Sequence, residues 1–171
     1  MSFFLPLLLA GALATPLATP TVSLDHKTPR ARRVVIDTAA HRQLAADYVV
    51  MARKAAEAGS LQEARAQLLV ANTMMRESGG LEETAVYALV HIDYALDRYV
   101  EAADMLNELS DEALKKGNPT LSANAALNAA ELYTLAGRRT QVSAAVSHVR
   151  SLLNDSRISE TDRRALKKRV G

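Results

Sequence analysis

Histidines and carboxylates are the residues of this 171-residue chain whose types could support catalysis or metal binding. No two histidines stand three or four residues apart, the spacing at which two ligands share one helical face. The four are His26, His41, His91 and His148. A lone helical histidine is more often packed or solvated than bound to a metal. We therefore predict no metal site.

A stripe of carboxylates is the second candidate for chemistry. Its members recur at spacings of three and four residues and so share one helical face: Asp97, Glu101, Asp104 and Glu108. Paired carboxylates can act as general acid and base, but one of them then needs an apolar pocket that raises its pKa. The sequence supplies no such pocket, so we interpret the stripe as a solvated face.

Other catalytic signatures are missing from the sequence. It contains no G-x-S-x-G elbow, P-loop, H-E-x-x-H motif or EF-hand loop. It also has no cysteine, which excludes disulfides, thiolate catalysis and cysteine-ligated metals. We therefore expect no enzyme activity and no cofactor.

The charge of the chain gives little reason to expect a nucleic-acid partner. Its 21 basic and 19 acidic residues leave a net charge of +2. A basic cluster near the C-terminus has no interleaved aromatic residue to stack on bases: Arg163, Arg164, Lys167, Lys168 and Arg169. We interpret this cluster as part of a basic capping helix within residues 156–171.

The N-terminal segment suggests export. Residues 3–14 form an uncharged apolar run that is too short to span a bilayer, and Ala12 and Ala14 provide a small-x-small cleavage pattern. We predict a signal peptide over 1–14, with cleavage up to residue 18 as a variant, and a periplasmic or secreted protein. An uncleaved segment that anchors the protein to the membrane is the alternative. Residues 15–38, rich in threonine and proline, are expected to form a disordered linker.

Helical periodicity with few breaks begins after this linker and predicts an all-α fold. The expected helices are separated by glycines and short polar turns. They cover His41–Ala58, Leu61–Glu77, Glu82–Leu96, Tyr99–Lys116, Pro119–Ala136, Arg139–Leu153 and Glu160–Val170. Three start signals support the division: a capping box of Ser60 with Glu63, the pair Asn118-Pro119, and a second box of Ser159 with Asp162.

A repeat appears when the hairpin turns are aligned on Gly59, Asp97 and Gly137, which are 38 and 40 residues apart. In the first unit, the pattern is carried by Tyr48, Met51, Ala52, Ala55, Gly59, Ala64, Leu68 and Ala71. These residues resemble the tetratricopeptide family, although the period exceeds the usual length of about 34 residues and Asp93 stands where an aromatic is expected.

The resemblance implies a right-handed α-solenoid of about three antiparallel helix hairpins over residues 39–155, followed by the capping helix. A closed six-helix bundle is the alternative. The repeat register also predicts that Ala64 and Ala102 are buried where helices cross.

The same resemblance implies a groove, lined by the first helix of each hairpin, that holds a peptide or helix. The groove positions are Ala46, Val49, Arg53, Ala56, Thr84, Tyr87, His91, Tyr94, Asn124, Leu127, Glu131 and Thr134. As partner-binding residues we select Arg53, Tyr87, His91, Tyr94, Asn124 and Glu131. The alternative for Tyr87 and Tyr94 is that they pack between hairpins.

These features predict a non-catalytic adaptor of the cell envelope or secreted fraction that binds a polypeptide partner. They indicate neither a nucleic-acid partner nor a stable membrane span. The alternative function is a self-associating helical bundle that encloses a small ligand, and homodimer formation stays open.

Overall fold

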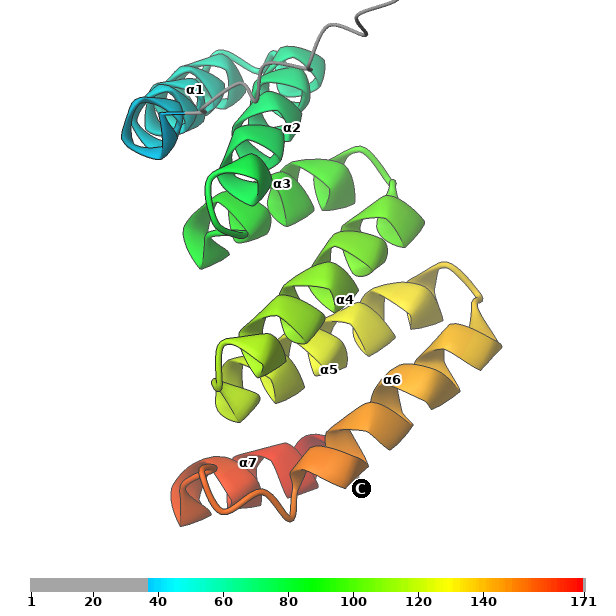
Figure 1. Ribbon diagram of the computed structural model, residues 1–171. Helices are drawn as coiled ribbons and strands as arrows, with labels where there is room; N and C mark the ends of the chain where they lie inside the picture. The colour runs from blue at the N-terminus through cyan, green and yellow to red at the C-terminus, as the bar shows by residue number, and fades with distance from the viewer. Residues whose placement is uncertain (1–36, 171) are drawn as a thin grey trace, which may run out of the picture. The chain divides into compact units, whose positions relative to one another are not determined.

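The computed structural model describes residues 37–170, in which all regular secondary structure is α-helical (Figure 1). The helices of this range are α1 (Thr38–Glu57), α2 (Leu61–Glu77), α3 (Glu83–Ala95), α4 (Tyr99–Lys115), α5 (Pro119–Leu135), α6 (Arg139–Leu152) and α7 (Glu160–Val170). The all-α prediction is therefore confirmed for the described residues. None of these helices combines the length and the apolar character that crossing a bilayer requires.

Apart from the start of the first helix, the predicted helix boundaries agree with the structure to within one residue. α1 begins at Thr38, which was assigned to the linker, and not at His41. Asp37 explains the difference, because its side chain accepts hydrogen bonds from the backbone N–H groups of Ala39 and Ala40 at 3.0 and 3.1 Å. The predicted signal peptide and the linker up to residue 36 lie outside the described residues.

The start at Asn118-Pro119 is confirmed, and the box of Ser159 with Asp162 is confirmed in part, since the Asp162 side chain accepts from the Ser159 hydroxyl and not from its backbone N–H. The Asn118 side chain accepts the Leu121 N–H at 3.0 Å, and the Ser159 hydroxyl accepts the Asp162 N–H at 3.1 Å. The capping box of Ser60 with Glu63 was wrong: Ser60 is the N-cap of α2, but its side chain makes no cap bond. Glu63 instead accepts a hydrogen bond from Gln67 at 3.2 Å, since residues four apart on a helix are neighbours.

One type of turn ends α1, α3, α4 and α5. In each, a backbone N–H bonds to the carbonyl five residues earlier, the Schellman pattern. The bonds, all 2.8 Å long, join Ser60 to Ala55, Arg98 to Asp93, Asn118 to Ala113 and Arg138 to Tyr133. The preceding residue has a positive φ each time and is Gly59, Asp97, Gly117 or Gly137. Asp97 thus fills a position that glycine holds in the other three turns.

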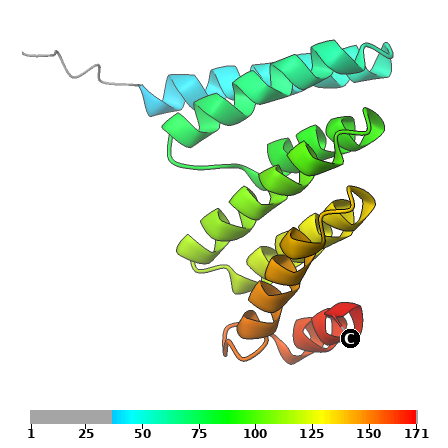
Figure 2. The ribbon, with the colours of Figure 1, turned by 90° about the vertical axis from the view of Figure 1, so that its right-hand side faces the viewer.

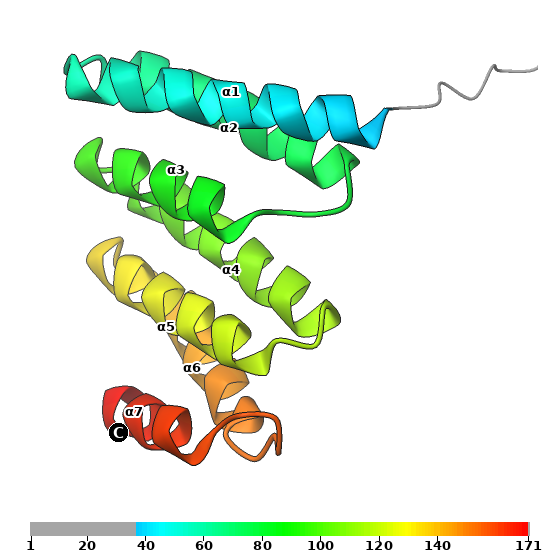
Figure 3. The ribbon, with the colours of Figure 1, turned by 90° about the vertical axis from the view of Figure 1, so that its left-hand side faces the viewer.

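Helix packing follows chain order in the described range. The most extensive contacts join helices that are consecutive in the chain, and α7 packs on both α5 and α6. Figures 2 and 3 show α1 and α2 at one end of this row and α7 at the other. The apolar core is accordingly divided into local clusters, among them one over α1 to α3 and one over α5 to α7. Ala64 and Ala102 are both fully buried, as the repeat register predicts.

A buried carboxylate joins α2 to α3. Asp93 is 2% exposed and forms an ion pair with Arg65 of α2. Arg98, at the start of α4, lies 3.8 Å from the same carboxylate. Asp93 stands where the repeat pattern expects an aromatic residue. Two cations neutralise its carboxylate, which would be costly to bury alone.

Candidate interaction surface

Two pockets lie beside α3, one between α1 and α3 and the other between α3 and α5. We name them the α3–α5 pocket, of about 400 Å³, and the α1–α3 pocket, of about 190 Å³. The helix that lies between the two walls in the chain contributes a leucine to each pocket. This is Leu106 of α4 in the α3–α5 pocket and Leu68 of α2 in the α1–α3 pocket. Both leucines are nearly or completely buried, so they form the floors of the pockets.

The α3–α5 pocket has an exposed apolar rim. Tyr94 and Leu135, both in its lining, are 51% and 57% exposed. The Tyr94 ring packs edge-on against Tyr99, with ring centroids 5.5 Å apart, which holds the aromatic side chain in place. A partly held aromatic ring at the edge of an apolar hollow loses little conformational entropy on binding, so it is suited to anchor a partner.

Tyr87 has a different role in the same pocket. It is partly buried, and its hydroxyl accepts a hydrogen bond from Asn128 of α5 at 3.2 Å. Burial is the main cause of the raised pKa of Tyr87. Tyr87 is therefore partly buried and bonded to α5, whereas Tyr94 is exposed at the rim of the pocket.

The C-terminal helix reaches the edge of this pocket through Arg169. Its guanidinium donates hydrogen bonds to Asn124 at 3.4 Å, Asn128 at 2.7 Å and Glu131 at 2.8 Å, all on α5. Glu131 also belongs to the pocket lining, so its charge is already paired within the chain. This contact of the C-terminal basic cluster with the predicted groove was not foreseen from the sequence.

The α1–α3 pocket is almost entirely apolar. Its walls come from α1 and α3, and Arg53 is the charged residue of its lining. Arg53 has no ion-pair partner among the residues that the structure describes. This pocket therefore offers apolar surface beside one cation that is free to pair.

The six selected residues thus divide between the two pockets. The structure brings Tyr87, His91, Tyr94 and Glu131 into the α3–α5 pocket, with Asn124 beside it through Arg169, and places Arg53 in the α1–α3 pocket. One groove position was wrong: Leu127 is only 4% exposed and packs in the cluster of α5 to α7. The reason is that α4, α6 and α7 all pack on α5, which leaves it a narrow free face.

A cluster of hydroxyl and imidazole groups escaped the sequence analysis. Ser110 of α4, Ser122 of α5 and His148 of α6 meet, with the His148 Nε2 3.3 Å and 3.2 Å from the two serine hydroxyls. Only packing unites them, since no two are closer than 12 residues in the chain. Both serines are at most 2% exposed, so a substrate cannot reach their hydroxyls, and the cluster satisfies buried polar groups where three helices meet.

The carboxylate stripe on α4 is exposed, as predicted, and its members have partners within the chain. Glu101 pairs with Arg98 at 2.7 Å, and Glu108 pairs with Arg76 of α2. Asp104 accepts a hydrogen bond from the Tyr133 hydroxyl at 2.6 Å. Burial and this hydrogen bond raise the pKa of Tyr133 to about 12.

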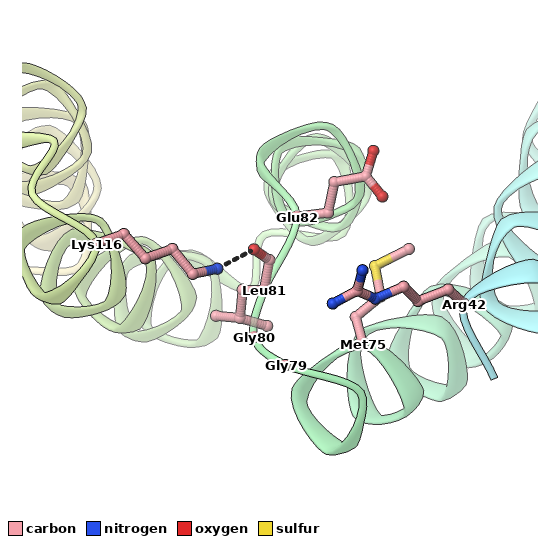
Figure 4. A pocket seen from close by; sticks show the side chains of 7 residues that line it. All are labelled: Arg42, Met75, Gly79, Gly80, Leu81, Glu82 and Lys116. Carbon is pink, nitrogen blue, oxygen red and sulfur yellow. Dashed lines mark hydrogen bonds between the residues drawn. The ribbon is translucent and has the colours of Figure 1, made fainter. Parts of the chain in front are cut away.

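A third pocket, of about 290 Å³, lies at the loop between α2 and α3 (Figure 4). Figure 4 shows Lys116 on one side of the loop, bonded to the Leu81 carbonyl, and Arg42 on the other. Arg42 donates to the Ser78 carbonyl at 2.8 Å, and Lys116 pairs with Glu112 at 3.2 Å. Because both cations bond to backbone carbonyls at this loop, we interpret them as clamps that hold it.

Comparisons with known proteins return no match to a family model, a curated protein or a solved structure. The geometry of the described residues is therefore the basis for the function proposed next. Within those residues, no group of three histidine or carboxylate side chains is placed to hold a metal ion.

Proposed function

We propose that the chain is a non-catalytic adaptor that binds a polypeptide segment across the two pockets beside α3. The observation that carries the proposal is the pair of apolar hollows, one on each side of a single helix, with Tyr94 and Leu135 exposed at one of them. The two hollows lie on opposite sides of α3, and a helix with its side chains is about 10–12 Å across. A partner with two apolar side chains at roughly that separation, as at positions i and i+7 of a helix, would fill both hollows.

The proposal includes an open, right-handed solenoid of tetratricopeptide-like hairpins. It is supported by packing that follows chain order and by pockets that separate α3 from α1 and from α5. In a closed bundle, α1 would instead pack against α6. Small-angle scattering discriminates the two, because an open array has a larger radius of gyration than a compact bundle of equal mass.

The charges at the pockets indicate what kind of segment fits. Glu131 is already paired with Arg169, whereas Arg53 is unpaired within the described residues. An acidic residue beside the anchor in the α1–α3 pocket would pair with Arg53. The partner is thus an amphipathic segment with two apolar anchors and a carboxylate. Because the sequence predicts an export signal, we propose that this interaction occurs in the periplasm or outside the cell.

The test uses a photo-crosslinking amino acid at position 94 and, separately, at position 53. We expect both positions to capture the same protein, since one segment spans both pockets. Position 150, exposed on the outer side of α6, serves as the control and should capture nothing specific. A synthetic peptide from the crosslinked segment is then titrated against the full chain.

In this titration, Tyr94→Ala should weaken binding by roughly 30-fold, the effect of losing a central aromatic anchor. Arg53→Glu should weaken it by about tenfold through repulsion of the acidic residue. A ligand that responds to Tyr94→Ala but not to Arg53→Glu occupies the α3–α5 pocket alone. That result would contradict a polypeptide segment that spans both pockets.

A further inference from the structure

An apolar stripe on α1 lies away from both pockets. The most exposed large apolar side chains of the described range are Leu44, Val50, Met51, Val70, Tyr94 and Leu135. The last two line the α3–α5 pocket, whereas three of the other four belong to α1. Val50 and Met51 are 51% and 49% exposed. Leu44, about two helical turns before Met51 on the same side of α1, is 44% exposed.

The position of α1 in the row makes this stripe unusual. A terminal unit of a stacked array needs a polar outer face to remain soluble. At the other end, α7 provides such a cover: Leu166 is buried among the apolar residues of α5 and α6, and the outer side of α7 is charged. Within the described residues, α1 has no comparable cover, so its apolar stripe is free to meet another surface.

Two opposite charges flank the stripe symmetrically. Asp47 stands three residues before Val50, and Lys54 stands three residues after Met51. Both are exposed and share the face of Val50 and Met51, as spacings of three, four and seven along a helix require. Within the described residues, neither has an ion-pair partner.

We propose that α1 binds α1 of a second copy of the chain, antiparallel and about a two-fold axis that passes between Val50 and Met51. This axis packs Val50 of each copy against Val50 of the other, and Met51 against Met51. It also places Asp47 of each copy against Lys54 of the other, which gives two equivalent ion pairs. A two-fold contact requires a self-complementary patch of this kind, and a parallel arrangement would oppose like charges.

The test measures the molar mass of the full chain in solution by light scattering over a wide concentration range. We expect a dimer that dissociates on dilution. The double variant Val50→Glu with Met51→Glu should halve the mass by placing four carboxylates at the axis. Unchanged circular dichroism would show that this surface change leaves the helices intact.

The charges allow a sharper test of the geometry. Asp47→Lys alone and Lys54→Asp alone should each raise the dimer dissociation constant about tenfold, since both ion pairs become repulsions. An equimolar mixture of the two single variants should dimerise again, because the lysines of one variant then face the aspartates of the other at both contacts. Asp111→Lys, the same charge change on the exposed surface of α4, is the matched control and should leave the dimer unchanged.

Three outcomes would overturn the proposal. A wild-type chain that stays monomeric at every concentration would mean that residues 1–36 or a different protein cover the stripe. A dimer that survives Val50→Glu with Met51→Glu would use another face. A mixture of single variants that stays monomeric would exclude the antiparallel two-fold. Tyr94→Ala leaves α1 untouched, so failure of this proposal is distinguishable from failure of the proposed function.

Discussion

At the scale of single residues, the left-handed position that ends four helices is the feature most directly tied to residue type. Gly59 has φ +79°, and a Cβ built there would meet no atom within 4 Å. Asp97 takes the equivalent position with φ 57°, and its carboxylate accepts a hydrogen bond from the Tyr99 hydroxyl at 2.6 Å. Backbone strain, not steric contact, therefore decides what these positions tolerate.

We expect Gly59→Ala to lower the free energy of unfolding by about 1–2 kcal/mol, the cost of the left-handed conformation for a residue with a Cβ. Chemical denaturation measures the change. Asp97→Asn is the comparison and should have almost no effect, since asparagine also tolerates this conformation. An equal loss in both variants would contradict this explanation of the turns.

Tyr133 predicts a dependence of stability on alkaline pH. Its pKa is raised from 10.0 in the free side chain to about 12 in the fold. The folded state therefore retains a proton that the unfolded chain releases above about pH 10. The contribution to stability is complete below that pH and is lost as the pH rises toward about 12.

The variant Tyr133→Phe isolates this effect. It removes the hydrogen bonds to Asp104 and from Asn107, and should cost about 1 kcal/mol at neutral pH. The loss of stability at alkaline pH should also become shallower. The tyrosinate absorbance that disappears in the variant should titrate near pH 12. A titration midpoint near pH 10, the ordinary pKa of tyrosine, would show that the Tyr133 hydroxyl is not buried and bonded to Asp104.

At the scale of helices, the junctions depend on two kinds of contact: buried ions and small side chains. Asp93 is 2% exposed, whereas its partner Arg65 has 18% of its side chain exposed. The carboxylate, and not the guanidinium, is therefore the group that cannot reach water. The two sides of the ion pair should respond differently to substitution.

We expect Arg65→Met to destabilise the protein by about 3 kcal/mol, because the Asp93 carboxylate stays buried with only the more distant Arg98 beside it. Asp93→Asn should cost less, since it removes the buried charge and leaves the guanidinium in contact with solvent. Thermal and denaturant unfolding of both variants test the order. The reverse order would mean that Arg65 depends on the pair more than Asp93 does.

Alanine at the helix crossings sets how closely the helices approach. Ala64 and Ala102 are fully buried, so leucine at either position should cost roughly 1–3 kcal/mol through overpacking. Ala144→Leu, on the exposed side of α6, is the control and should change stability little. Unfolding midpoints that stay unchanged in both buried variants would contradict the proposed repeat register.

At the scale of the whole described unit, the proposed open array predicts that stability is a sum of local terms and of junctions between neighbouring helices. α4 and α5 have packed helices on both sides, whereas α1 stands at an end of the row (Figure 3). Hydrogen exchange should therefore be slowest in α4 and α5 and faster toward the ends. Uniform protection from α1 to α6 would instead indicate a closed, fully cooperative bundle.

The sequence by itself determined the all-α class and nearly every helix boundary. These depend on local signals: apolar periodicity, turn glycines, and caps such as Asn118-Pro119, which act within a few residues of where they stand. The same local reasoning missed Asp37 as the cap of α1 and expected a bond at Ser60 that an i,i+4 pair replaces. It placed Tyr87, His91 and Tyr94 on one face, because that is a property of a single helix.

Tertiary structure alone decided which of these faces became pockets, floors or buried walls. Arg53 and Tyr94 lie in different hollows, Leu127 is buried, and Arg169 reaches Glu131 across 38 residues. Ser110, Ser122 and His148 meet only because three helices converge. Periodicity tells which residues share a side of a helix, but the neighbour that covers this side is fixed by packing between distant segments, for which a single sequence has no local signal.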